Sequence, residues 1–183
     1  MKMEEKKTRK KMRLKGADYN NPGAYFITIC TKERRCVLSH IVGTGVPDGP
    51  ISVELLPYGK IAEKYIQQLN DFYDNISIER YVIMPNHIHI LLFLNPNENN
   101  TDSGLTENED GPSRTPVPTI QNSIVSRFVS TFKRFTNKEY GMNIWQYRSY
   151  DHIIRNQKDY EEHVNYIYYN PIRWHLDELY TEE

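Results

Sequence analysis

Two histidines separated by one residue, His87 and His89, stand inside an apolar run of the sequence. Side chains alternate across a β-strand, so the two imidazoles share one face while Ile88 and Ile90 share the other. Such a pair can present two nitrogens to one divalent metal ion, and a third ligand must then come from elsewhere. The alternative is a pair of hydrogen-bonded core histidines. Pro85 precedes the pair, which predicts a position near the strand start, at a sheet edge that solvent reaches.

A second pair of reactive side chains lies near the C-terminus, in the helical stretch at residues 157–169. At about 100° per residue, Tyr166 and Asn170 are neighbours on one face, away from the apolar stripe. That stripe is formed by four residues: Tyr160, Val164, Ile167 and Tyr168. A tyrosine hydroxyl can attack a phosphate that a metal ion polarises, and an asparagine oxygen can complete the metal shell. Imidazole and amide ligands with open positions favour Mg²⁺ or Mn²⁺. The alternative for Tyr166 is a surface aromatic that packs on a loop.

The elements that would position these residues form an α+β pattern. Strands are predicted at residues 24–31, 36–42, 51–55, 76–84 and 87–94, and helices from residue 57, at 120–138 and at 157–169. The long apolar strands indicate the centre of a sheet that helices cover. Residues 95–118 contain five acidic residues and little that can pack, so they are predicted to be a flexible loop.

The charge of the chain is divided unevenly. The 183 residues carry a net charge of −1, but residues 1–15 hold eight Lys or Arg and two Glu. A basic arm on an acidic body is typical of a protein that binds a polyanion such as nucleic acid, although a solvated terminus has the same composition. Six basic residues of the arm and three of the helix at 120–138 are candidate DNA contacts: Lys6, Lys7, Arg9, Lys10, Lys11, Arg13, Arg127, Lys133 and Arg134.

The remaining composition indicates a cytoplasmic protein. Cys30 and Cys36 are not spaced as a CxxC pair, which favours free thiols. No apolar run has the length of a membrane span, and the basic N-terminus lacks the apolar run of a signal peptide.

Three motifs together resemble a known family. The stretches VIMPNHIHILL, IWQYRSYDHIIRN and YIYYNP, in this order, are similar to those of the single-tyrosine HUH transposases, in particular the REP-associated tyrosine transposases. The resemblance covers about residues 13–175. It implies a ferredoxin-like or RRM-like sandwich with a central antiparallel sheet, and metal-dependent strand transfer on single-stranded DNA, often at hairpins.

The resemblance also implies roles for single residues. His87 and His89 match the metal ligands, Tyr166 matches the nucleophile that forms a covalent 5′-phosphotyrosine, and Asn170 matches a third polar ligand. Asp151 and His152 lie in a family-like stretch, with a DNA-positioning role or a helix-entry hydrogen bond as the two interpretations.

The domain prediction follows from these observations. Residues 1–20 are a basic arm, residues 21–175 are the catalytic domain with its acidic loop at 95–118, and residues 176–183 are a tail. The expected partner is single-stranded or hairpin DNA, with no membrane and no small-molecule substrate. The protein is expected to be a monomer or homodimer associated with the nucleoid. The alternatives are a catalytically silent DNA-binding relative and a metallohydrolase that uses water as its nucleophile.

Overall fold

A four-stranded antiparallel sheet forms the centre of the computed structural model, which describes residues 20–43, 51–96 and 123–181. The strands lie in the order β4 (Ile76–Ile83), β5 (His87–Leu94), β1 (Gly23–Cys30) and β6 (Tyr150–Ile153). Helix α1 (Pro57–Phe72) connects β1 to β4, and helix α2 (Ile124–Tyr140) connects β5 to β6. This βαββαβ order is the ferredoxin-like arrangement. The predicted α+β fold is therefore confirmed.

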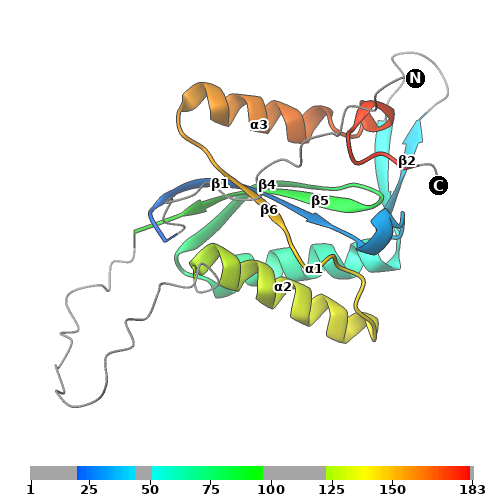
Figure 1. Ribbon diagram of the computed structural model, residues 1–183, viewed down its shortest axis with the longest axis horizontal. Helices are drawn as coiled ribbons and strands as arrows, with labels where there is room; N and C mark the ends of the chain where they lie inside the picture. Colours follow the sequence, from blue (N-terminus) through cyan, green and yellow to red (C-terminus); the bar gives the residue numbers. More distant parts are fainter. Residues whose placement is uncertain (1–19, 44–50, 97–122, 182–183) are drawn as a thin grey trace, which may run out of the picture.

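The two faces of the sheet are covered by different helices. Helices α1 and α2 pack on one face, and α3 (Gln157–Tyr169) lies across the other (Figure 1). Strand alternation divides β5 accordingly: Ile88 and Ile90 enter the large core beneath α1 and α2, while Leu91 packs against Ile167 of α3. His87 and His89 are in phase with Leu91, so they belong to the face beneath α3.

A separate two-stranded sheet stands at one end of the molecule. It pairs β2 (Ser39–Gly43) with β3 (Ile51–Leu55), so the predicted strand at 36–42 begins three residues later than expected. The first turn of α1 lies close to the backbone just before β2. A Cβ at Gly59 would lie 2.0 Å from the carbonyl oxygen of Leu38. Only glycine fits at that position.

Three details differ from the sequence prediction. Strand β6 was not expected, because it is only four residues long and lies at the sheet edge within a polar, aromatic stretch. Helix α2 begins at Ile124, after Ser123, whose side chain accepts a hydrogen bond from the backbone N–H of Ser126. Tyr168 was wrongly placed in the apolar stripe of α3: it is 66% exposed, and the α3 residues that pack towards the sheet are Tyr160, Val164 and Ile167.

Some predictions lie outside the described residues. These are the basic arm, except for Asn20, and the acidic loop, except for Asn95 and Pro96. Of the helices in the described ranges, none combines the length and the apolar character that a membrane crossing demands.

Candidate functional site

The histidine pair lies at the start of β5, directly after the tight turn that joins it to β4. The backbone N–H of Met84 donates to the carbonyl of His87 (2.9 Å) and closes this turn. The predicted position at the strand start is thus observed, but the predicted solvent access is wrong. Strand β5 lies between β4 and β1, so His87 is 0% and His89 2% exposed.

Hydrogen bonds leave one nitrogen of each imidazole without a partner. Asn86 Oδ1 lies 2.8 Å from His87 Nδ1, and because this oxygen can only accept, Nδ1 carries the proton and Nε2 the lone pair. His89 Nδ1 pairs with Thr28 Oγ1 at 2.9 Å. Both Nε2 atoms are buried and have no hydrogen-bond partner among the described residues. A buried polar atom without a partner is costly, and a metal ion would remove that cost.

Burial also keeps both imidazoles neutral. It lowers the pKa of His87 to about 4, although the nearby carboxylate of Asp177 acts in the opposite direction. Burial likewise lowers the pKa of His89, and the neighbouring His87 adds to that effect. Neutral imidazole is the form that binds metal, so the pair is ready to coordinate at neutral pH.

Helix α3 brings Tyr166 and Asn170 over the histidine face of the sheet. The Tyr166 ring packs edge-on against His89, with ring centroids 5.0 Å apart, and against Phe26. Asn170 follows the last helical residue, is 3% exposed, and its Oδ1 has no partner among the described residues. Its position before Pro171 does not turn the side chain away from the cluster. His87, His89 and Asn170 thus each contribute one partnerless buried atom, and the tyrosine packs directly on His89.

Asp177 is a member of the site that the sequence did not indicate. Its Oδ2 accepts hydrogen bonds from Tyr166 Oη (2.8 Å) and Asn170 Nδ2 (2.7 Å). One of its oxygens and one nitrogen of each imidazole, His87 and His89, all lie within 4.8 Å of one another. A His/His/Asp group of this kind can hold a metal ion. Asp177 falls in the predicted tail, in no recognisable motif, so only the three-dimensional contacts could reveal it.

The turn before the histidines holds the segment that carries Asp177. Asn86 Nδ2 donates to the carbonyl of Leu179 (2.8 Å) and to Thr181 Oγ1 (3.0 Å). Asp177 Oδ1 accepts from the backbone N–H of Leu179 (2.6 Å). One asparagine side chain therefore fixes both His87 and the segment from Asp177 to Thr181, which couples the two halves of the site.

Burial raises the pKa of Tyr166 above its ordinary value, and the charge of Asp177 adds to this effect. The hydroxyl is consequently protonated at neutral pH and needs a proton acceptor before it can act as a nucleophile. The Asp177 carboxylate already receives that hydrogen bond. The tyrosine side chain is 42% exposed and lines an open cavity of about 1350 Å³, together with His89, Asn170 and Asp177.

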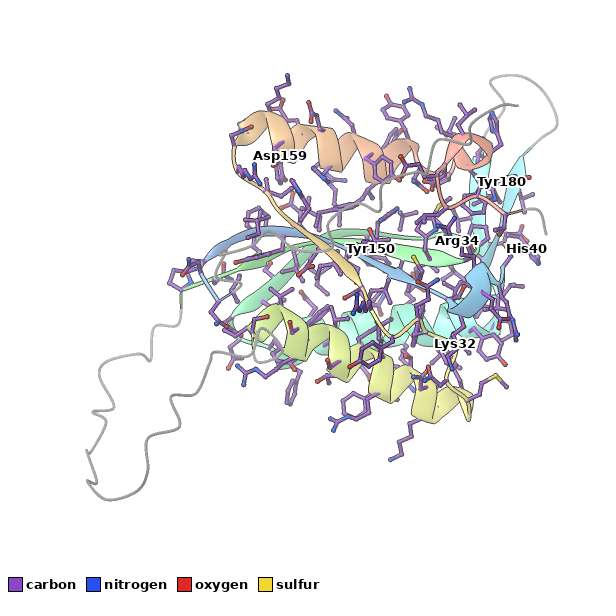
Figure 2. The ribbon with its side chains drawn as sticks, in the orientation of Figure 1. Lys32, Arg34, His40, Tyr150, Asp159 and Tyr180 are labelled. Atoms are coloured by element: carbon purple, nitrogen blue, oxygen red, sulfur yellow. The ribbon has the colours of Figure 1, made fainter. Side chains whose placement is uncertain are left out.

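Arg34 lies on the rim of this cavity with an unusual backbone. Its φ of 54° and that of Glu33, 56°, are in the left-handed region, which non-glycine residues seldom adopt. The Arg34 guanidinium donates to the carbonyl of Glu178 (3.0 Å), at the end of the molecule where Tyr180 also lies (Figure 2). Strain of this kind is often found at functional sites.

The predicted DNA-contacting residues of α2 are not brought to the tyrosine. Arg127, Lys133 and Arg134 lie on a helix that covers the opposite face of the sheet (Figure 1). Lys133 Nζ donates to the carbonyls of Gln146 (2.9 Å) and Tyr147 (3.3 Å), and burial lowers its pKa to about 8. Contacts of these three residues with DNA remain a prediction, as do those of the arm, which lies outside the described residues.

The family-like pair, Asp151 and His152, lies on β6 at the edge of the sheet. His152 Nε2 pairs with both carboxylate oxygens of Asp159, at 3.0 Å each, in the first turn of α3. This is the expected helix-entry hydrogen bond. Asp151 belongs to the same edge strand and also lines the cavity.

Comparisons with known proteins place the chain among transposase relatives, although no protein-family model matches it. An uncharacterized protein of Haemophilus influenzae is 32% identical over 177 residues, covering 95% of this chain and 94% of that protein. A REP-associated tyrosine transposase of Escherichia coli is 32% identical over 96 residues, covering 52% of this chain and 44% of that protein. A putative REP-associated tyrosine transposase of Haemophilus influenzae is 26% identical over 156 residues, covering 85% and 74%.

A solved structure shares the fold. The structure of a REP-associated tyrosine transposase bound to a REP hairpin matches with a TM-score of 0.56 and 22% identity, covering 88% of this chain and 74% of that one. The sheet and the helices that cover it share the fold of that transposase. The chain belongs to one family with the uncharacterized protein of Haemophilus influenzae, and it is a homologue of the REP-associated tyrosine transposases.

Proposed function

We propose that this protein is a metal-dependent endonuclease and strand transferase that acts on single-stranded DNA at hairpins. The observation that carries this proposal is a set of partnerless buried atoms, His87 Nε2, His89 Nε2 and Asn170 Oδ1, in residues grouped around Asp177, the acceptor of the Tyr166 hydroxyl. Such atoms are rare in folded proteins because each costs about 1–3 kcal/mol. Three in one site are best accounted for by a cation that satisfies them together.

His87, His89 and Asn170 would hold the ion, with Asp177 as a carboxylate ligand within reach. When bound, Mg²⁺ or Mn²⁺ polarises a phosphate oxygen and stabilises the charge that develops on it. Hydrogen bonds of the two Nδ1 atoms with Asn86 Oδ1 and Thr28 Oγ1 keep the imidazoles of His87 and His89 oriented.

Tyr166 is the proposed nucleophile. Its Oη forms a bond to phosphorus as the bond from phosphorus to the 3′ oxygen breaks, which leaves a 5′-phosphotyrosine and a 3′-hydroxyl that takes a proton from solvent. The proton of the tyrosine passes to Asp177, whose Oδ2 lies 2.8 Å from Oη. Attack by a 3′-hydroxyl on the phosphotyrosine later restores the tyrosine, so the transfer needs no external energy source.

Hairpin DNA is proposed as the partner because the structurally similar transposase is bound to a REP hairpin. Because DNA is the proposed partner, we expect the protein to lie in the cytoplasm, associated with the nucleoid. The second candidate is a DNA-binding relative without catalysis. It is favoured by one observation: burial raises the pKa of Tyr166, and the Asp177 carboxylate that accepts its hydrogen bond adds to this effect.

One gel assay separates the candidates. Labelled single-stranded hairpin DNA is incubated with the full chain and Mn²⁺ or Mg²⁺, then resolved under denaturing conditions. A covalent adduct that Tyr166→Phe abolishes supports the proposal. Tyr168→Phe is the matched control, since this tyrosine of α3 is 66% exposed and is not among the residues that line the cavity. Binding without an adduct favours the silent relative, and cleavage that survives Tyr166→Phe indicates water as the nucleophile.

A further inference from the structure

A second group of metal-binding side chain types lies along the wall of the same cavity, at the other end of α3. It consists of His152 on β6, Asp159 in the first turn of α3 and His163 one turn later. One ligand atom of each lies within 4.8 Å of the other two. Asp159 marks this group at the start of α3, far from Tyr180 (Figure 2). The proposed strand-transfer chemistry does not use these residues.

Local structure fixes the carboxylate of the group. Asn156 caps α3 by accepting a hydrogen bond from the backbone N–H of Asp159 (2.9 Å). Asp159 Oδ2 in turn accepts from the backbone N–H of Arg155 (3.0 Å). Because β6 ends only four residues before α3 begins, His152 is held directly against this first helical turn.

Ring packing orients the two imidazoles. His152 and His163 are stacked, with centroids 4.7 Å apart and planes 16° apart. His163 also packs on Phe26, at 4.6 Å between ring centroids. The i,i+4 spacing of Asp159 and His163 puts both on one helix face. The donors therefore come from two rigid elements, and the stacked rings must turn about their χ2 angles to aim both in-plane lone pairs at one ion.

The separations between donor atoms suit a zinc-type ion. His152 Nε2 lies 3.0 Å and His163 Nδ1 lies 3.2 Å from the same carboxylate oxygen, Asp159 Oδ1. In a tetrahedral shell with bonds of about 2.0–2.1 Å, neighbouring ligand atoms are about 3.3 Å apart. His163 Nδ1 is also 2.8 Å from the carbonyl of Asp159, so in the metal-free protein it donates there. A bound ion would replace the protons that these nitrogens share with Asp159.

We infer that His152, Asp159 and His163 form a second divalent-cation site, of the His₂Asp type that Zn²⁺ and Co²⁺ occupy. Three protein donors leave one coordination position open, and both imidazoles line the cavity, so this position is accessible to solvent or to a phosphate of bound DNA. The site is distinct from the one at His87, His89 and Asp177, and its existence does not depend on the nuclease proposal.

A cobalt titration tests this inference. The chelator-treated, tag-free full chain of the His87→Ala/His89→Ala variant is titrated with Co²⁺, and visible absorbance is followed. This variant should still bind one equivalent, with the intense spectrum of a four-coordinate ion, and Zn²⁺ should displace it while Mg²⁺ should not. Adding Asp159→Asn to this variant should abolish the signal.

Two comparisons make the result decisive. His40→Ala, a change to an exposed histidine on β2, should leave the bound equivalent unchanged. Circular dichroism verifies that each variant is folded. The inference is overturned if the His87→Ala/His89→Ala variant is folded and binds no Co²⁺, or if its bound equivalent survives Asp159→Asn.

Discussion

His89, a proposed metal ligand, has a buried nitrogen without a partner. We therefore expect that replacing this histidine by an apolar residue makes the metal-free protein more stable. In the variant Thr28→Val/His89→Leu, both members of the 2.9 Å hydrogen bond are replaced by apolar groups of similar shape. Such a paired replacement is nearly neutral, whereas removing the buried, partnerless Nε2 gains about 1–3 kcal/mol. The metal-free variant should therefore unfold with a free energy about 1–3 kcal/mol higher than that of the wild type.

Urea denaturation of chelator-treated protein at neutral pH measures this difference, and thermal melts provide a second reading. For a domain of this size, each kcal/mol corresponds to roughly 2–4 °C in Tm. Mn²⁺ should raise the Tm of the wild type and leave that of the variant unchanged, because the variant lacks one of the two imidazole ligands.

The matched control is Thr136→Val, which makes the same change at a fully satisfied buried position. The Thr136 hydroxyl donates to the carbonyl of Phe132 (2.8 Å) and accepts from Trp145 Nε1 (2.7 Å). Without this hydroxyl, the buried indole N–H of Trp145 has no acceptor, so the variant should be less stable by about 1–3 kcal/mol. The reasoning is refuted if the metal-free double variant is less stable than the wild type by more than about 1 kcal/mol, since His89 would then be a structural residue.

Three further predictions concern a carboxylate, the pH dependence of folding and a glycine. Asp177→Asn should weaken Mn²⁺ binding about 10–100-fold by calorimetry, and an unchanged affinity would exclude this carboxylate from the metal site. The pKa of His87 is lowered from 6.5 to about 4, so the unfolded chain binds protons first as the pH falls. Stability should be independent of this group above about pH 6.5 and fall by about 3 kcal/mol towards pH 4, as urea titrations at each pH would show. The decline should be shallower in Thr28→Val/His89→Leu, because this variant lacks His89, the second imidazole whose pKa burial lowers. Gly59→Ala should destabilise the protein by at least about 1–3 kcal/mol in the same denaturation assay, because its Cβ meets the backbone of Leu38. Gly43→Ala meets nothing closer than 3.9 Å and should be mild by comparison.

Most of the sheet and helix order could be predicted from the sequence. The apolar runs of β1, β4 and β5 are long, and α3 has strong boundaries, with Asn156 before it and Asn170-Pro171 after it. These elements can be recognised from short stretches of sequence, because the spacing of apolar residues and the helix caps both depend on residues close together in the chain. Strand β6 is short and at the edge, so its four residues carry too weak a pattern.

The site could be predicted only where its residues repeat at a regular spacing. The strand period placed His87 and His89 on one face, and the helix period placed Tyr166 beside Asn170. The burial of the histidines depends on β1 lying beside β5, a pairing between segments some sixty residues apart. Asp177 depends on a contact network centred on Asn86, which no spacing rule describes.

The division of the site between β5 and the segment from Tyr166 to Asp177 has a consequence for how such proteins diverge. The large core beneath α1 and α2 includes neither Tyr166 nor Asp177. A change at Tyr166 or Asp177 is therefore expected to remove the proposed nucleophile or a proposed ligand without disturbing that core. On the proposed chemistry, one mutational step separates an active member of the lineage from a silent one with the same scaffold, and the reverse step restores activity.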